Sequence, residues 1–77
     1  MLFLQKIGQK IKKFRLEKGM TVATLAELAG ISKGMLSQIE NSRAVPSFQT
    51  LFDTLKALDV PPSVFFEGIE FNNRKRF

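Results

Sequence analysis

Apolar residues recur at helical spacing along most of this 77-residue chain. The first such segment places them three, four and three positions apart, at Leu4, Ile7, Ile11 and Phe14. This spacing puts them on one face of a helix over residues 2–18, and lysines occupy much of the remaining surface. Gly19 is of a type that commonly ends helices. The pattern therefore predicts an amphipathic first helix.

A second, shorter helix is predicted to begin after Thr21, which is a good N-cap residue. Leu25 and Leu28 lie three positions apart in it, and we expect both to face inward. Ala26 is small enough to let a neighbouring helix approach closely. Gly30 can adopt the left-handed conformation that ends this helix sharply.

The third predicted helix covers residues 32–41, with Ser32 as its cap and with Leu36 and Ile39 facing the core. Its solvent side offers three hydrogen-bonding side chains, those of Lys33, Ser37 and Gln38. A protruding helix can enter the major groove of DNA and reach the edges of the bases. The two helices and the tight turn between them therefore predict a DNA-reading helix-turn-helix.

Two more helices are predicted in the second half of the chain. Ser47 is a candidate N-cap for a fourth helix, whose apolar residues have a 3.6-residue period: Phe48, Leu51, Phe52, Leu55 and Leu58. Residues 59–61 interrupt it, and Pro62 suits the first position of a short fifth helix that runs to Phe66. The predicted fold class is all-α.

Length and composition narrow the possible functions. We expect one folded domain over residues 1–67, with the helix-turn-helix at about 21–41 and a short tail at 68–77. The chain contains no cysteine and no histidine, which excludes zinc fingers, Ser-His-Asp hydrolases and Cys-His proteases. Its formal charge of +5 favours a polyanionic partner, above all nucleic acid. We expect no enzyme activity, catalytic residue, metal or cofactor.

No apolar stretch is long enough for a signal-peptide core or a membrane span, so we expect a cytoplasmic protein with no membrane contact.

The order and identity of the residues resemble the lambda-repressor/Cro-like, or XRE-type, helix-turn-helix family. The matching positions extend from Ile7 to Phe66: Ile7, Gly8, Ile11, Arg15, Met20, Thr21, Leu25, Ala26, Ser32, Leu36, Ser37, Ile39, Glu40, Pro46, Ser47 and Leu55 to Leu58. The resemblance implies a compact five-helix DNA-binding domain that pairs as a homodimer on a near-palindromic operator.

The resemblance also implies roles for individual residues. The base-reading positions are Lys33, Gly34, Ser37 and Gln38. Phosphate contacts are expected from the ends of helices, at Thr21, Ser32, Asn41, Ser42 and Arg43, with Lys12 or Lys13 adding longer-range attraction. The alternative for Lys12 and Lys13, and the preferred one, is an ordinary solvated helix face. Arg15 and Glu40 match a family pair that fixes the reading helix against the first helix, so we expect a structural ion pair.

Two positions depart from the family pattern. Val22 stands where the family often has a glutamine that contacts phosphate and braces the first reading side chain. Gly34 has no side chain where the family often reads a base. One hypothesis is that Gly34 lets the backbone approach DNA closely, and the alternative is a tolerated surface glycine.

Pairing is expected through the apolar C-terminal region. The candidate interface residues are Val60, Pro61, Phe66, Ile69 and Phe71, and Phe65 is expected to fill the monomer core. An exposed apolar patch of this kind suggests an interface. The alternative is that these side chains cover the underside of the first helix.

The sequence therefore predicts a sequence-specific, double-stranded DNA-binding transcriptional regulator. We expect a dimeric repressor or controller-type protein, without a small-molecule effector bound by this chain. Two alternatives stay open. The chain can be the DNA-binding module of a larger ligand-sensing regulator, or an antitoxin-like module whose C-terminus binds another protein.

Overall fold

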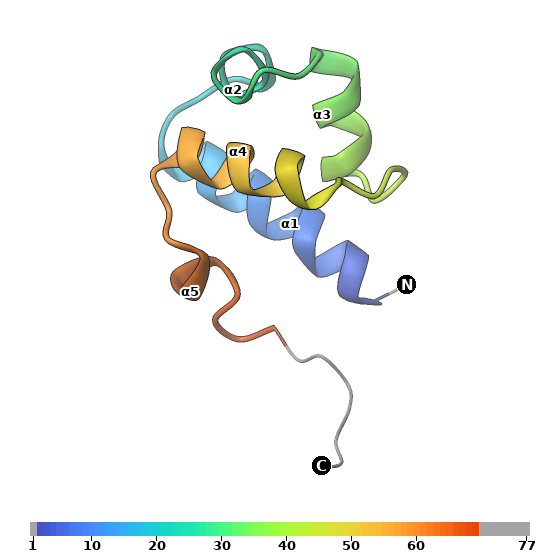
Figure 1. Cartoon of the computed structure of the whole chain (residues 1–77), viewed down its shortest axis with the longest axis vertical. Coiled ribbons are helices and arrows are strands. Elements are labelled where there is room, and N and C mark those ends of the chain that lie inside the picture. Colours follow the sequence, from blue (N-terminus) through green and yellow to red (C-terminus); the bar gives the residue numbers. More distant parts are fainter. Residues whose placement is uncertain (1, 70–77) are drawn as a thin grey trace.

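The computed structural model describes residues 2–69, and residues 2 and 4 by their backbone alone. Within that range all regular structure is helical, as Figure 1 shows. The helices are α1 (Leu2–Glu17), α2 (Val22–Ala29), α3 (Lys33–Glu40), α4 (Phe48–Leu58) and α5 (Pro62–Phe65). The predicted all-α class is confirmed. The predicted roles of the Leu4 side chain and of residues 70–77, including Phe71, lie outside the described residues.

The predicted N-caps are all present. The hydroxyl oxygens of Thr21, Ser32 and Ser47 each accept a hydrogen bond from a backbone N–H three residues later, at 3.0, 3.0 and 3.1 Å. These bonds satisfy N–H groups that have no partner inside the helix. The starts of α2, α3 and α4 are therefore fixed by local chemistry.

Gly30 ends α2 as predicted, with a left-handed φ of 77°. In that conformation the N–H of Ile31 donates to the carbonyl of Ala26 at 3.0 Å, so the chain turns at once toward α3. Asp59 ends α4 in the same way with a φ of 58°, a conformation that few residues other than glycine adopt. Both turns are sharp, and they hold the helices close together.

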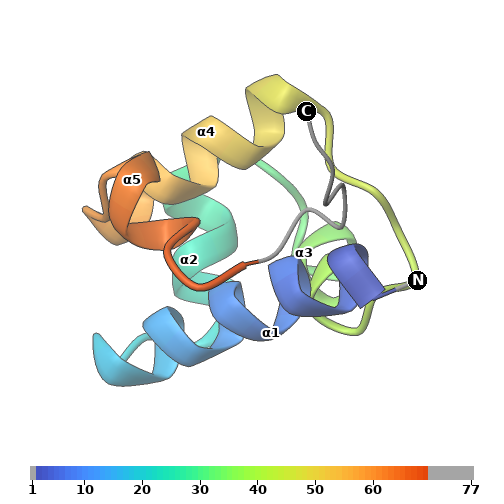
Figure 2. The same ribbon diagram turned by 90° about the horizontal axis from the view of Figure 1, so that it is seen from below.

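The core lies where α1, α2, α3 and α4 meet, as the two ribbon views show (Figures 1 and 2). α2 packs against α3 and α4, and α1 packs against α3. The most deeply buried apolar side chains are those of Ile11, Leu25, Leu36, Leu55, Leu58 and Phe65. Phe65 is fully buried, which confirms its predicted place in the core.

Three side chains of the predicted apolar periods are exposed, and one of them, Leu28, was expected to face inward. Leu28 is 59% exposed because the buried stripe of α2 runs through Leu25, Ala26 and Ala29 and leaves Leu28 at its edge. Phe48 is 81% exposed, since it begins α4 beyond the point where the core ends. Phe52 is also exposed. The expectation for Leu28 was wrong because a helical period gives a direction but does not show how far the core extends.

Gly8 determines how closely α1 approaches α3. A Cβ atom on Gly8 would lie 2.5 Å from the carbonyl oxygen of Ile39 and 2.9 Å from that of Glu40. Both are backbone atoms, so a side chain at Gly8 would force the two helices apart. The only side chain that fits this contact is a hydrogen atom.

The C-terminal region folds back onto the core more completely than predicted. Val60 and Ile69 are each only 7% exposed, and both belong to the main apolar cluster. Ile69 and three residues of α1, namely Lys6, Gln9 and Lys10, line the same small hollow. The expectation that Ile69 is uncovered is therefore wrong, and the alternative that it covers α1 is correct. No helix within residues 2–69 is long and apolar enough to cross a membrane.

Candidate nucleic-acid interface

The two faces of α3 differ sharply in what they contact. Leu36 and Ile39 point into the core and are almost fully buried. On the opposite side Lys33, Gly34 and Gln38 are exposed. Within the described part of the chain, the side chains of Lys33 and Gln38 make no hydrogen bond or ion pair, while Ser37 is half-buried at the edge. The outer face therefore presents donors and acceptors that the fold itself does not use.

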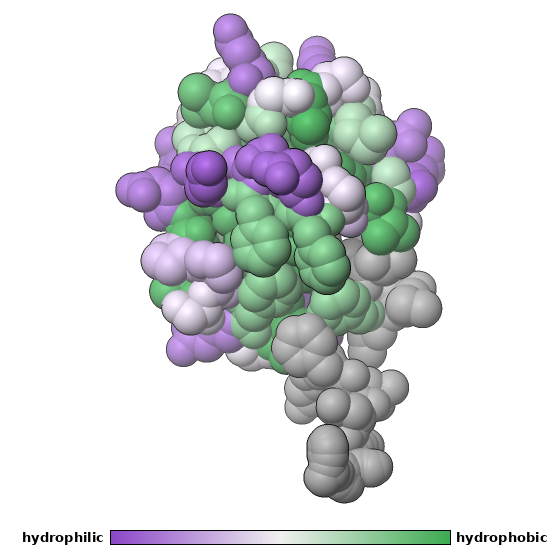
Figure 3. Space-filling view, viewed as in Figure 1, coloured by the Kyte–Doolittle hydropathy of each residue, from purple (hydrophilic) through white to green (hydrophobic). Residues whose placement is uncertain are grey.

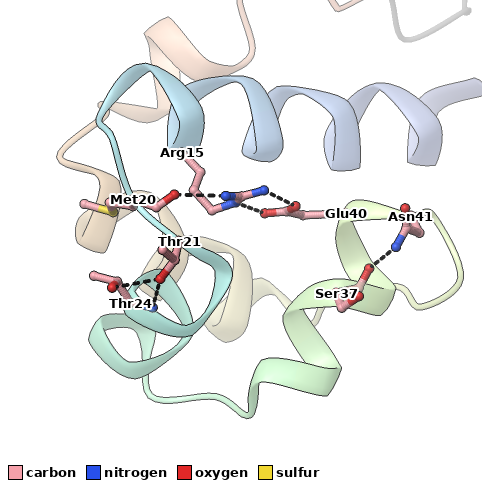
Figure 4. Close-up of polar contacts among 7 residues, drawn as sticks. All are labelled: Arg15, Met20, Thr21, Thr24, Ser37, Glu40 and Asn41. Atoms are coloured by element: carbon pink, nitrogen blue, oxygen red, sulfur yellow. Dashed lines mark hydrogen bonds and ion pairs between the residues drawn. The ribbon is translucent and has the colours of Figure 1, made fainter.

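The inner end of α3 is fixed by a buried ion pair. The Nε of Arg15 donates to Oε2 of Glu40 at 2.7 Å, and Nη2 donates to Oε1 at 3.0 Å. Both residues are less than 10% exposed. Figure 4 shows the planar guanidinium lying against the carboxylate in a two-pronged contact. The predicted pairing of Arg15 with Glu40 is confirmed, and its geometry is the strong, directional kind.

The same guanidinium also fixes the segment between α1 and α2. Its Nη1 donates to the carbonyl oxygen of Met20 at 2.9 Å (Figure 4). Arg15 therefore connects α1, the segment before α2 and the end of α3. This contact holds the first and second helices of the helix-turn-helix at one relative angle, which a DNA-reading surface requires.

The N-terminal ends of α2 and α3 both offer main-chain N–H groups. The Ser32 hydroxyl accepts the N–H of Met35, and the N–H groups of Lys33 and Gly34 come before Leu36, the first residue whose N–H donates to a backbone carbonyl of the helix. A Cβ on Gly34 would have no atom within 4 Å, and its φ is not left-handed. Neither packing nor backbone conformation therefore requires a glycine at Gly34.

Thr21, a predicted phosphate ligand, uses its hydroxyl inside the protein. Its oxygen accepts the N–H of Thr24, and it donates to the hydroxyl oxygen of Thr24 at 3.0 Å (Figure 4). The exposed donor at the start of α2 is therefore the Thr24 hydroxyl, which sequence reasoning missed. The sequence feature that could have pointed to Thr24 is its position three residues after the N-cap Thr21, in the first, exposed turn of α2. Val22, which replaces the family glutamine, is half-buried against the core.

At the other end of α3 the predicted phosphate ligands form a cluster with α1. Asn41 donates from Nδ2 to the carbonyl of Ser37 at 2.9 Å, so part of its amide closes the helix (Figure 4). A polar hollow lies beside it, lined by Gln5, Gln9, Lys12, Glu40, Asn41 and Ser42. Arg43 is exposed next to this cluster. The structure therefore brings Lys12 together with the residues that follow α3.

The other lysines of α1 have different surroundings. Lys13 lies 3.8 Å from the carboxylate of Glu17, one turn further along α1, and above the ring of Phe14. Lys10 donates to the backbone carbonyl of Glu67. Only Lys12 of these three lines the hollow beside α3. The structure therefore places Lys12, and not Lys13, beside the residues that follow α3.

No group of three or more acidic, histidine or cysteine side chains within residues 2–69 is placed to hold a metal ion. What the region does provide is a capped, exposed helix braced by a second helix across a tight turn. That arrangement defines a helix-turn-helix fold of the DNA-binding type.

Comparison with known proteins places this fold in a family. The helix-turn-helix family model matches residues 11–65. The HTH-type transcriptional regulator SinR of Bacillus subtilis is 49% identical over 55 residues, which is 70% of this chain and 50% of SinR. The immunity repressor protein of Bacillus phage phi105 is 40% identical over 77 residues, covering 90% of this chain and 54% of the repressor.

A solved structure extends the similarity to three dimensions. The restriction-modification controller protein C.Esp1396I, as a tetramer in complex with its natural 35 base-pair operator, matches with a TM-score of 0.83. The identity is 37%, and the match covers 87% of this chain and 88% of that protein. The chain belongs to the XRE-type helix-turn-helix family. It spans about half the length of the curated regulators SinR and the phi105 repressor.

Proposed function

We propose that this chain is a sequence-specific transcriptional regulator that reads double-stranded DNA with the outer face of α3. The observation that carries this proposal is the contrast between the two faces of α3. The buried Arg15–Glu40 pair fixes the helix from inside, while the side chains of Lys33 and Gln38 face outward and have no polar partner among residues 2–69. A rigidly held helix with unused polar groups is suited to the major groove.

The base contacts follow from side-chain chemistry. Lys33 can donate to the O6 or N7 atom of guanine, and Gln38 can form a two-pronged contact with adenine. Ser37 lies between them at the edge of the surface and suits a shorter-range contact. Gly34 adds no side chain, so the backbone of the first turn can come close to the DNA. The open space around Gly34 agrees with this role.

Phosphate contacts flank the reading face on both sides. On the α2 side they come from the start of the helix, where Thr24 is the exposed hydroxyl and Thr21 holds it in place. Ser32 contributes from the cap of α3. On the far side they come from Asn41, Ser42 and Arg43, with Lys12 of α1 beside them. These contacts position the protein but do not read sequence.

We propose a homodimer as the active form, since one domain reads only half a site. Pairing would place two reading helices in successive major grooves about 34 Å apart on a near-palindromic operator. The controller protein C.Esp1396I is a tetramer on its operator, which supports assembly on DNA. Of the predicted interface residues, Val60 and Ile69 are buried in the monomer, whereas Pro61 is exposed and Phe66 is half-buried.

As a regulator of this kind, the protein would act in the cytoplasm without cofactor or catalytic step. A second candidate keeps the same DNA-reading role but makes it one module of a larger regulator. The observation that favours this version is that the chain spans 50% of SinR. Measuring the mass of the protein that its own cell makes would distinguish a stand-alone regulator from the DNA-binding module of a larger one.

The proposed function is tested by selecting bound sequences from a random duplex pool at two salt concentrations. We expect a two-fold symmetric consensus at both concentrations, with total binding falling steeply as salt rises. Binding without sequence preference would contradict the proposal. A consensus without two-fold symmetry would support DNA reading but not the homodimer.

A further inference from the structure

Two glutamine side chains of α1 have no polar partner in the described part of the fold. In Figure 3 a hydrophilic band crosses the middle of the molecule over α4, and within α4 the amide of Gln49 donates to the carboxylate of Asp53 at 2.9 Å. Gln5 and Gln9 differ from Gln49, because both are exposed and neither side chain makes a hydrogen bond within residues 2–69. Their amide groups are therefore available to a ligand.

Gly8 brings these amides to the C-terminal end of α3. At this glycine α1 approaches α3 so closely that a Cβ would lie 2.5 Å from the carbonyl oxygen of Ile39. Gln9 is the next residue, Gln5 lies one turn before it and Lys12 lies one turn after it, so the three side chains share one flank of α1. This α1 row lines a polar hollow of about 400 Å³ together with residues at and after the end of α3: Glu40, Asn41 and Ser42.

The hollow offers hydrogen-bond donors beside a positive charge. Its carboxylate, that of Glu40, is neutralised by two hydrogen bonds from Arg15. Among the described residues Lys12 is the only cation that lines the hollow, and its ammonium group has no ion pair or hydrogen bond within residues 2–69. Each glutamine amide adds two N–H donors. The hollow is therefore suited to anionic oxygen atoms.

We propose that the α1 row binds the sugar–phosphate backbone of the DNA whose bases α3 reads. In this assignment Gln5 and Gln9 donate to phosphate oxygens, and Lys12 supplies the positive charge. The inference rests on the proposed function and adds the first helix to its DNA interface. Glutamine is among the side chains that contact phosphates in protein–DNA complexes, and such contacts fix the position of a protein on the duplex.

The length of the α1 row favours DNA over a free anion. Gln5 and Lys12 are one row apart by two helical turns, which is about 10 Å along a helix that rises roughly 1.5 Å per residue. Successive phosphates of one strand are about 3.4 Å apart along the DNA axis, so a row of this length can contact more than one of them. A single inorganic phosphate would reach only part of the row.

Neutral donors and cations affect a binding titration differently. A lysine that neutralises a phosphate releases a condensed counterion, so its contact weakens as the salt concentration rises. A glutamine carries no charge and releases no counterion. Loss of the glutamine contacts should therefore lower DNA affinity by the same factor at every salt concentration.

Titration of the selected operator duplex with the full chain at several salt concentrations tests the proposal. Gln9→Ala should lower affinity about fivefold, and the double variant Gln5→Ala, Gln9→Ala about 25-fold, as expected for one and two hydrogen bonds. The slope of log affinity against log salt, the base preference and the melting temperature should not change, since both side chains are exposed and lack polar partners among residues 2–69.

The control is Lys6→Ala, because Lys6 belongs to α1 but does not line the hollow. This substitution removes a full charge, yet it should weaken binding less than about twofold at about 0.15 M salt, where distant charges are screened. A larger loss in Lys6→Ala than in Gln9→Ala would overturn the proposal. If the row binds another protein instead, the double variant keeps the original DNA affinity and the proposal fails.

Methylphosphonate substitution, which removes the charge of one DNA phosphate at a time, identifies the bound group. At a phosphate that Gln9 contacts, the substitution should weaken binding by the original chain but should have little further effect on Gln9→Ala. Independent, multiplicative effects of the two changes at every phosphate would show that Gln9 does not bind the DNA backbone.

The two proposals fail in different ways. If the glutamine variants lose DNA affinity but the chain selects no DNA sequence, the α1 contact stands and sequence reading by α3 is wrong. If the chain selects a consensus and the double variant binds it as tightly as the original chain does, the function stands and the α1 contact is wrong.

Discussion

The inner and outer faces of α3 carry opposite kinds of interaction within one eight-residue helix. The inner face is closed, with Leu36 and Ile39 in the core and Glu40 in a buried, two-pronged ion pair with Arg15. The outer face is open, and in the described part of the chain Lys33 and Gln38 have no polar partner. Stability and recognition therefore depend on different residues of the same helix.

This separation has a consequence for mutation. A change on the inner face should alter melting and DNA affinity together, because the reading helix loses its support. A change on the outer face should alter DNA binding alone. Each of the following substitutions tests one side of that division.

The largest effect is expected from Glu40→Ala, which leaves the buried guanidinium of Arg15 without its partner. Removing one member of a buried pair costs roughly 3–5 kcal/mol of unfolding free energy. In a domain of this size we expect the melting temperature to fall by more than about 10 °C. DNA affinity should fall as well. Calorimetric melting and a binding titration measure both effects.

Glu17→Ala is the control for that substitution. It also removes a carboxylate from an ion pair, but Glu17 and Lys13 are both more than half exposed and 3.8 Å apart. An exposed pair of this kind changes stability by less than about 1 kcal/mol. Weakened DNA binding with unchanged melting in Glu40→Ala would show that Glu40 belongs to the reading surface instead.

A smaller loss of stability is expected for Gly8→Ala. The new Cβ would lie 2.5 Å from the Ile39 carbonyl oxygen, and separating α1 from α3 should cost about 1–3 kcal/mol. The matched control is Gly34→Ala, on the outer side of α3, where a Cβ meets nothing within 4 Å. Alanine is the better helix former, so Gly34→Ala should melt at the same or a higher temperature.

The Gly34 variants also test the close-approach hypothesis. If the backbone at Gly34 lies against DNA, Gly34→Ala should weaken operator binding without loss of stability. Gly34→Gln should weaken it further. Tighter binding by Gly34→Gln in the same register would show that the glycine is merely a tolerated surface residue.

The smallest expected effect concerns salt dependence. Lys12 lies beside Asn41 and Ser42, whereas Lys13 pairs with Glu17. Lys12→Ala should reduce the slope of log affinity against log salt by about 0.9, the value for one phosphate contact. Lys13→Ala should change the slope much less. Equal slopes of log affinity against log salt for the two variants would show that Lys12 does not contact a DNA phosphate.

The features predicted correctly from the sequence are those set by neighbouring residues. Thr21, Ser32 and Ser47 cap helices because a hydroxyl reaches an N–H three residues away. Gly30 ends α2 because its own backbone can be left-handed. Arg15 and Glu40 are separated by 25 positions, and their pairing was predicted only from the family resemblance.

The features that escaped prediction depend on tertiary surroundings. Phe48 continues an apolar period, but the core ends before it, and Ile69 finds cover only because the chain returns to α1. Gly8 matters through carbonyl groups of α3 that no local pattern shows. Thr24 becomes the exposed donor only after Thr21 has used its own hydroxyl.

The central claim is that the outer face of α3 reads DNA while its inner face stabilises the fold. The most direct test of this claim is the base preference of the variant Gln38→Ala. Its affinity would be measured against every single-base variant of the selected half-site, alongside its melting temperature. We predict a loss of about 1–3 kcal/mol of discrimination at one base pair, with the other positions and the melting temperature unchanged. An unchanged profile, or a uniform loss across all positions, would contradict the assignment of Gln38 to the reading face.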